Sequence, residues 1–379
     1  MSEHAAPTSA PIAPEQSAER PTLTSEDAPR WWRLGRWLLL VPVLLVPFYA
    51  PADWLIIGIF SMAAAVAAVG LTVLVGTAGQ LSLAHAFFIA VGAYTYAFLA
   101  GERGGDGSYT GLGLPPLLGA VVAVLAAGVA GFVFSPVAAR LRGLYLGVAS
   151  IALVFIGEHV WKNAVPVTGG ENGRSVEPLA AFGFELSGEN PALVVGGVPF
   201  GARERLWYLA VVALLVAVIM AHRVVRGRPG RALQLMRDNS SAARSMGINV
   251  RGYKALVFSF SSLFAGAGGV LLALAFQIIS PINFGLQLSI LYLAMAVVGG
   301  LGSVGGTVLG AFFVTALPLV LDKYSSVLPF LAPTGSGGLD AKMLATFVFG
   351  AAIVLVIVLE PGGLGTLMRR LRARLPRRA

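Results

Sequence analysis

The sequence predicts an all-α, polytopic integral membrane protein with about ten transmembrane helices and with both termini in the cytoplasm. Of the 379 residues, 56% are hydrophobic and 12% are charged, whereas a soluble domain carries about 25% charged residues. The apolar residues form blocks of roughly 20, which matches the thickness of the hydrocarbon layer of a bilayer. The 47 glycines fit the same class, because small residues let membrane helices approach closely.

The apolar blocks lie within residues 34–367, which we expect to form the transmembrane domain. Their centres, in chain order, are Leu45, Ala65, Ile89, Leu125, Ala152, Leu214, Phe264, Leu293, Phe312 and Ile353. Glycine-rich breaks at residues 76–80 and 299–303 are either turns or interruptions inside the membrane. Residues 1–33 have the composition of a disordered cytoplasmic tail, and residues 368–379 form a basic cytoplasmic tail.

The positions of Lys and Arg test this topology, because these residues are enriched in cytoplasmic loops. With the N-terminus inside and ten crossings, most of the 27 Lys and Arg residues fall on the inside. The outer loop at about 163–204 is polar and glycine-rich, and the inner loop at about 223–254 is strongly basic. Within the inner loop, residues 231–246 contain few helix breakers and predict a short helix, with Gly247 where that helix stops.

Several kinds of chemistry are excluded or disfavoured by residues that the sequence lacks. A phosphate-binding loop needs Gly-Lys, and no lysine here follows a glycine. ATP, if it is used, must therefore be bound by another chain. The absence of cysteine excludes disulfides and thiolate metal sites. We predict no catalytic residue, metal or cofactor in this chain, and no nucleic-acid partner, because membrane topology and lipid headgroups explain the net charge of +9.

The acidic residues lie in tails, in loops or near predicted helix ends, with Asp53, Glu158, Asp322 and Glu360 closest to the membrane. Ion-coupled transporters usually hold acidic residues in mid-membrane. This pattern therefore disfavours a secondary transporter driven by an ion gradient, which we keep as the alternative function. It also disfavours a hydrolase with paired carboxylates.

Three polar residues, Gln80, Ser82 and His85, stand at the start of the third apolar block. We interpret them as candidates to line a translocation path. The other interpretation is that they form hydrogen bonds between helices, as polar residues in membrane helices often do. A membrane enzyme or scaffold that acts on lipid is a third hypothesis. Its nearest nucleophile and base are Ser82 and His85, three residues apart on one helical face, and no third orienting group is evident.

The order of residues in the inner loop carries a family resemblance. The loop contains Arg237-Asp238-Asn239, then Ser241-Ala242-Ala243, then Gly247-Ile248-Asn249. This resembles the coupling segment of bacterial ABC import permeases of the branched-chain amino acid type, the LivH/LivM family. That segment has a Glu-Ala-Ala-x-x-x-Gly core, and Ser241 stands here in the position of the Glu.

Other stretches resemble the same family and follow in the same order. Residues 76–88 are similar to its Gly-x-x-Gly-Gln-x-Ser-Leu-Gly-His signature, with Ala84 in place of the last Gly. Residues 141–145, 298–303 and 361–364 also match family landmarks, so the resemblance leaves only the two tails unmatched. The long outer loop makes the LivM-like branch the better fit.

The resemblance implies a permease subunit of an ATP-driven importer in the bacterial cell membrane. A solute-binding protein outside the cell would deliver the solute, and a second, related permease subunit would complete the path. Two cytoplasmic subunits would bind and hydrolyse ATP. The residues implied in coupling to them are Arg237, Asp238, Ser241, Ala242, Ala243 and Gly247. Branched-chain amino acids are the first candidate solutes, and urea, short amides and other small amino acids stay open.

Overall fold

The structure is a computed structural model, and it describes residues 40–102, 110–141, 143–181, 183–190, 193–195 and 198–324, with short helical pieces between 343 and 365. The chain divides into two units, Met1–Val46 and Pro47–Ala379. In the first unit the described residues begin helix α2 (Leu40–Tyr49). The predicted tails at 1–33 and 368–379, the block centre Ile353 and the landmark at 361–364 lie outside the described residues.

Seven helices in the described part of the chain are long and apolar enough to cross a membrane, by length and composition. They are α3 (Ala52–Thr72) with its π-helical end η2 (Val73–Thr77), α5 (Pro116–Arg140), α6 (Leu144–Asn163), α8 (Ala202–Arg226), α11 (Val250–Phe276), the 3₁₀ turn η4 (Pro281–Phe284) with α12 (Leu286–Gly299), and α13 (Val304–Lys323). The shorter α4 (His85–Ala100) is also apolar. The predicted block centres from Ala65 to Phe312 each fall in one of these helices, so the polytopic helical class is confirmed.

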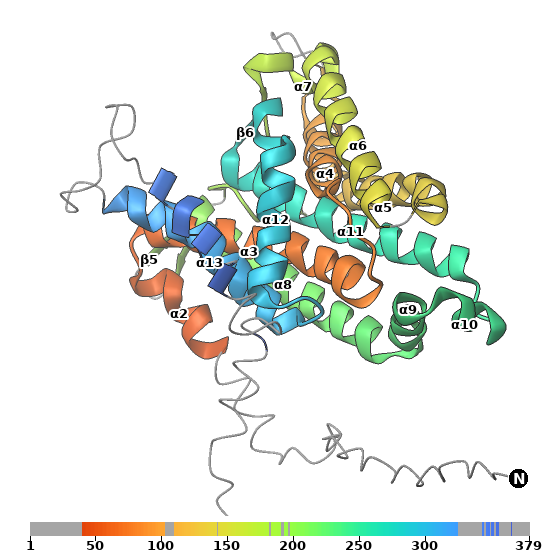
Figure 1. The fold of residues 1–379 in the computed structure, drawn as a ribbon. Coiled ribbons are helices and arrows are strands. Elements are labelled where there is room, and N and C mark those ends of the chain that lie inside the picture. The colour runs from red at the N-terminus through yellow and green to blue at the C-terminus, as the bar shows by residue number, and fades with distance from the viewer. Residues whose placement is uncertain are drawn as a thin grey trace, which may run out of the picture. The chain divides into compact units, whose positions relative to one another are not determined.

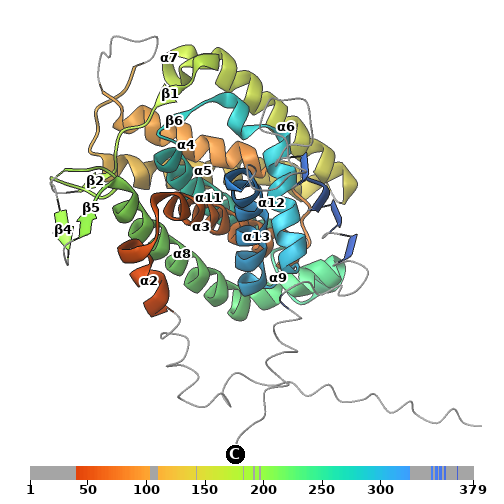
Figure 2. The same ribbon diagram turned by 90° about the vertical axis from the view of Figure 1, so that its left-hand side faces the viewer.

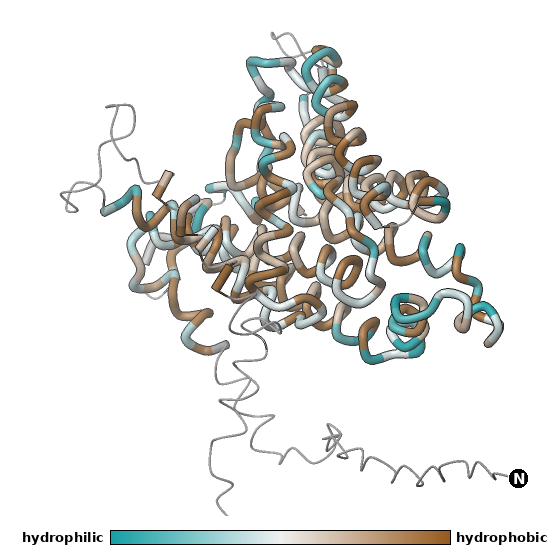
Figure 3. Tube along the Cα trace, viewed as in Figure 1, coloured by the Kyte–Doolittle hydropathy of each residue, from teal (hydrophilic) through white to brown (hydrophobic). Residues whose placement is uncertain are grey.

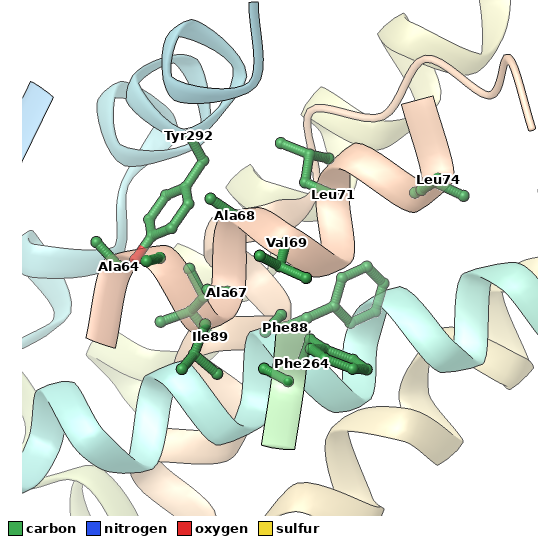
Figure 4. Packing of buried hydrophobic residues seen from close by; sticks show 14 of the residues in the cluster. Ala64, Ala67, Ala68, Val69, Leu71, Leu74, Phe88, Ile89, Phe264 and Tyr292 are labelled. Atoms are coloured by element: carbon green, nitrogen blue, oxygen red, sulfur yellow. The ribbon is translucent and has the colours of Figure 1, made fainter. Parts of the chain in front are cut away.

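Helices α3 and α11 form the centre of the second unit (Figures 1 and 2). Within an apolar 18-residue stretch of α3 and η2, 89% is buried inside the protein, and within the corresponding stretch of α11 the buried share is 67%. The sequence of α3 explains this position, because its alanines and glycines make a thin helix that neighbours can approach from all sides. Figure 4 shows Phe88 and Ile89 of α4, Phe264 of α11 and Tyr292 of α12 around it.

The outer helices α5, α6 and α8 leave most of their apolar surface exposed. Within an apolar 18-residue stretch of each helix, only 28%, 28% and 22% is buried inside the protein, respectively. Figure 3 shows hydrophobic residues along these helices. A helix that is apolar on its outer face as well as its inner face is typical of a lipid environment or of a subunit contact. This exposure agrees with a membrane location.

The segment predicted as the outer loop contains small elements that the all-α prediction did not include. After α7 (Val165–Thr168) and the 3₁₀ turn η3 (Gly170–Asn172), strand β1 (Arg174–Ser175) pairs antiparallel with β6 (Ile278–Ile279), which follows α11. Two antiparallel hairpins follow, β2 (Ala180–Ala181) with β3 (Phe184–Glu185) and β4 (Leu193–Val195) with β5 (Val198–Phe200). Extended pairing satisfies backbone N–H and C=O groups that a loop would otherwise leave unpaired.

In the second unit, the ends of the helices form two groups, and one contact in each group shows which ends lie together. Lys254, in the first turns of α11, donates a hydrogen bond from Nζ to the Ala138 carbonyl at the end of α5 (3.1 Å). Lys323, at the end of α13, forms an ion pair from Nζ to Oδ2 of Asp53 at the start of α3 (3.2 Å). Starts of some helices therefore adjoin ends of others, as expected for a chain that runs up and down through a membrane.

Candidate functional site

The basic inner loop folds as two helices, α9 (Arg228–Asp238) and α10 (Ser240–Ser245), between α8 and α11. The prediction of one helix over 231–246 is therefore wrong. Asn239 interrupts the helix in an extended conformation (φ −150°, ψ 101°). Its Oδ1 accepts hydrogen bonds from the backbone N–H groups of Ser241 and Ala242, both at 3.0 Å. An Asn side chain that caps a new helix competes with continuation of the old one.

Gly247 ends this segment as the sequence predicts. Its φ of +78° lies in the left-handed region that glycine adopts without strain. The Gly247 N–H donates to the Arg244 carbonyl (2.9 Å), and the Ile248 N–H donates to the Ala243 carbonyl (3.0 Å). This pair of hydrogen bonds is the Schellman arrangement that closes many helices.

The predicted coupling residues divide into a buried and an exposed group. Ala243 is fully buried and fixes α10 against the rest of the protein. Ser241, Arg237, Asp238 and Gly247 are exposed, and Ala242 is half-buried. Beside these predicted residues, the apolar side chain of Met246 is 74% exposed. Figure 3 shows hydrophilic residues concentrated on α9, in contrast to the membrane helices. The segment thus presents a basic surface with an exposed methionine at its end.

Arg237 connects this segment to the break between α3 and α4. It lies in the last turn of α9, and its Nη1 donates a hydrogen bond to the Gly76 carbonyl at the end of η2. Gly79 has a φ of +65°, and a β-carbon placed there would lie 2.8 Å from Arg237 Cγ. The arginine stem therefore rests on the glycine backbone. The carbonyls at a helix end lack partners within the helix, and a basic side chain is a favourable donor to them.

A cavity of about 380 Å³ lies at this junction. The α3–α4 break, the start of α6, the α9–α10 junction and the start of α11 all contribute to its walls. Its polar lining includes Gln80, Arg237, Asp238, Asn239 and Lys254. The structure therefore brings the predicted path residue Gln80 together with the predicted coupling residues Arg237 and Asp238.

Ser82 and His85 lie deeper in the protein. His85 is 2% exposed, its Nε2 lies 2.9 Å from the Ala67 carbonyl of α3, and its ring centroid lies 5.2 Å from that of Tyr292. Ser82 Oγ accepts a hydrogen bond from the Ala84 N–H (3.3 Å). Because α4 begins at His85, Ser82 precedes the helix, and the expectation that the two share a helical face is wrong. His85 makes the interhelical hydrogen bond that the second interpretation describes, and its place on a path stays a prediction.

Sequence reasoning missed two serines that position this break. Ser150 Oγ of α6 accepts a hydrogen bond from the Leu83 N–H (2.8 Å). Ser289 Oγ of α12 accepts one from the Ala86 N–H in the first turn of α4 (3.0 Å). These N–H groups have no partner within a helix, and the serines satisfy them. Serines are frequent in apolar helices, so no pattern in the sequence distinguishes these two.

Sequence reasoning also missed two buried arginines in the outer loop region. Arg174 is 1% exposed and donates from Nη1 to the Thr110 carbonyl (3.0 Å). Arg205 is 6% exposed and donates from Nη1 to the carbonyls of Glu185 (3.0 Å) and Asn190 (2.9 Å). The sequence identifies both only as basic residues on the predicted outer side. Their role is to hold loop backbone in place, because buried charge must be hydrogen-bonded.

Comparison with known proteins identifies the family. Residues 55–358 match the family model described as "Branched-chain amino acid transport system / permease component". The chain belongs to this family. It is 31% identical over 336 residues to the high-affinity branched-chain amino acid transport system permease protein LivM of Escherichia coli K12, covering 86% of this chain and 73% of that protein.

Two further relatives align at lower identity. The permease protein BraD of the high-affinity branched-chain amino acid transport system of Pseudomonas aeruginosa PAO1 is 27% identical, over 70% of this chain and 86% of that protein. The LivH permease protein of Escherichia coli K12 is 25% identical, over 79% and 90% of the two chains. No solved structure matches significantly. The predicted LivM-like membership is confirmed, and this chain is a permease subunit of an ABC importer and a multi-pass inner membrane protein.

Proposed function

We propose that this permease subunit moves branched-chain or related small amino acids delivered by a solute-binding protein outside the cell. A second permease of the same family completes the path, since the relatives include both LivM and LivH permeases. Two cytoplasmic subunits bind ATP and dock on α10. The observation that carries this proposal is the α9–α10 segment, which is exposed, basic and linked by Arg237 to the α3–α4 break.

We further propose ten crossings with both termini in the cytoplasm. The two groups of helix ends support this arrangement. The α10 helix and the cavity lie beside the group that contains the start of α11, and the hairpins of the outer loop lie beside the other group. The absence of native cysteine makes the test direct. A single cysteine at Glu171 is expected to react with a membrane-impermeant maleimide in intact cells. A cysteine at Ser241 is expected to react only after the cells are opened, and the reverse pattern would overturn the topology.

The ATPase docking surface is tested by purification from native membrane. Met246→Glu and Arg244→Glu change exposed side chains on α10 and its C-terminal end, and Ala243 is left intact because it is fully buried. We expect both variants to lose the cytoplasmic ATPase subunits that purify with the parent. Arg223→Glu makes the same charge change as Arg244→Glu, at the end of α8, and serves as the control. Retention of the ATPases by both α10 variants would contradict docking there.

The solute is tested by uptake into proteoliposomes that hold the whole importer with ATP inside. We expect the binding protein to stimulate uptake of leucine, isoleucine or valine, and expect urea to be transported poorly. Uptake driven by an ion gradient without ATP would contradict the importer mechanism. Efficient uptake of urea with no uptake of amino acids would contradict the proposed solute class and leave the importer mechanism intact.

A further inference from the structure

Arg237 differs from the other arginines of the inner loop because its side chain crosses to another element. Within the described residues, its guanidinium reaches the Gly76 carbonyl, and its stem packs on Gly79. Arg231 lies on the same helix and is exposed, as Arg237 also is, but no contact joins it to the α3–α4 break in the described residues, so it provides a matched comparison. The contact of Arg237 thus joins α9 directly to the backbone at the end of η2.

The α3–α4 break is in turn packed against the second glycine-rich break. A β-carbon at Gly76 would lie 2.1 Å from the backbone nitrogen of Gly302. The two backbones are therefore in contact with no side chain between them. One helical turn away, the hydroxyls of Thr72 and Thr307 share a buried hydrogen bond between α3 and α13. A displacement of the end of η2 must move the connection between α12 and α13 as well, because close-packed backbones leave no space to absorb it.

The same break positions the start of α4. Residues 78–84 lead into His85, and the first turn of α4 is held by Ser289 of α12. From α9 there is thus a continuous series of contacts through Arg237 to the α3–α4 break, and from there to α12 and α13. Arg237 is the one charged side chain in this series. Packed side chains and hydrogen bonds of this kind carry coupling between sites only if they have two arrangements that both sites influence.

We propose that Arg237 is the positioning residue that transmits movement of the α9–α10 segment to the α3–α4 break, so that ATP hydrolysis on the partner subunits is coupled to solute movement. The inference rests on the proposed docking of the ATPases on α10. Arg237 touches neither ATP nor solute in this scheme. It sets the position of Gly76 and Gly79, and through them the position of Gln80 at the cavity.

The decisive measurement is solute transported per ATP hydrolysed by the whole importer in proteoliposomes. We expect Arg237→Ala to keep ATP hydrolysis within about twofold of the parent and to lose about tenfold or more of transport per ATP, the scale of one hydrogen bond from a charged group. Arg231→Ala is expected to match the parent. Arg237→Lys keeps the positive charge but replaces the planar guanidinium with an ammonium group, and its transport per ATP is expected to lie between those of the parent and Arg237→Ala. Normal transport per ATP in Arg237→Ala would overturn the inference.

A reversible crosslink separates transmission from folding. A β-carbon at Gly79 would lie 3.4 Å from Cβ of Arg237, close to the span of about 3.5–4.5 Å that a disulfide bridges. The double variant Gly79→Cys/Arg237→Cys introduces the only two cysteines of the chain. We expect the reduced importer to hydrolyse ATP with poor transport, and expect oxidation to restore transport per ATP to within about threefold of the parent, because the covalent link replaces the lost contact.

The outcomes distinguish the inference from the proposed function. If oxidation abolishes transport that the reduced form performs, the two segments move apart during the cycle and the inference is wrong. If Arg237→Ala does not assemble, Arg237→Lys decides the question by the same ratio, and a ratio equal to that of the parent would overturn the inference. If the parent chain itself purifies without ATPases or shows no ATP-dependent uptake, the proposed function fails, whatever the variants do.

Discussion

The contact between α4 and α11 gives the sharpest stability prediction. Gly269 of α11 faces α4 so closely that a β-carbon there would lie 2.2 Å from the Ile89 carbonyl oxygen. The reciprocal contact occurs one turn away, where a β-carbon at Gly92 would lie 2.4 Å from the Gly266 carbonyl oxygen. The two helices thus pack backbone against backbone. Gly269→Ala must force them apart, because a carbonyl cannot swing aside as a flexible side chain can.

The expected cost follows from two opposing terms. Alanine in place of glycine inside a helix stabilises the folded state by up to about 1 kcal/mol through its higher helix propensity. Overpacking of a well-filled core costs typically about 1–3 kcal/mol. Ile89 is fully buried, and α11 also packs on α3 and α5, so a shift of α11 disturbs three interfaces. We therefore expect the overpacking cost to exceed the gain, for a net loss of about 1–2 kcal/mol.

The assay is thermal unfolding of the purified chain in detergent. We expect the midpoint for Gly269→Ala to fall by about 1–3 °C. The control is Gly119→Ala in α5, where the nearest atom to a new β-carbon is 3.5 Å away, an ordinary contact distance. That variant is expected to match the parent or to gain slightly. An unchanged midpoint for Gly269→Ala, or an equal fall in Gly119→Ala, would refute the argument from backbone contact.

Three further predictions concern α10 and the hairpins of the outer loop. Asn239→Ala removes the cap of α10 at a cost of about 1 kcal/mol, so amide exchange across residues 240–245 is expected to rise about fivefold; unchanged exchange would count against the cap. Arg205→Ala leaves buried loop carbonyls without a donor at a cost of about 2 kcal/mol, and limited proteolysis within the outer hairpins is expected to accelerate, whereas cleavage at the parent rate would refute this role. The hydrogen bond from the Asn190 backbone N–H holds the pKa of Glu185 below its usual value. The ionised Glu185 side chain therefore stabilises the hairpin fully above the ordinary carboxyl pKa, and this stabilisation is lost as the pH falls through the lowered pKa. Proteolysis followed from pH 7 downward is expected to show this loss in the parent and a flat response in Glu185→Gln, and identical profiles would contradict it.

The apolar blocks determined most of the helical architecture in advance. Each predicted centre from Ala65 to Phe312 lies in a helix, because a run of about 20 apolar residues has few alternatives in a bilayer. Gly247 was correctly predicted as a helix stop, since its left-handed conformation is a local property of glycine. The family resemblance also followed from local motifs. The exact helix count stays a prediction, because the last apolar block lies outside the described residues.

Predictions from the sequence were wrong where alternative hydrogen bonds compete for the same backbone groups. The sequence predicted one helix over 231–246, and Asn239 divides that segment because capping α10 satisfies two N–H groups at once. It placed Ser82 on the same helix as His85, whereas α4 begins only at His85. No pattern in the sequence indicates that the arginines of the outer side are buried, yet Arg205 is 6% exposed and donates hydrogen bonds to loop carbonyls.

The sequence by itself determined the class of protein, the membrane helices, the absence of a nucleotide-binding loop and the basic segment between α8 and α11. Those properties follow from residues adjacent in the chain. Only the tertiary structure decided that Arg237 reaches Gly76, that Gly76 adjoins Gly302, and that Gln80 shares a cavity with the coupling segment. These contacts join residues far apart in the chain. Their existence depends on how closely whole helices approach, which no local pattern of residues specifies.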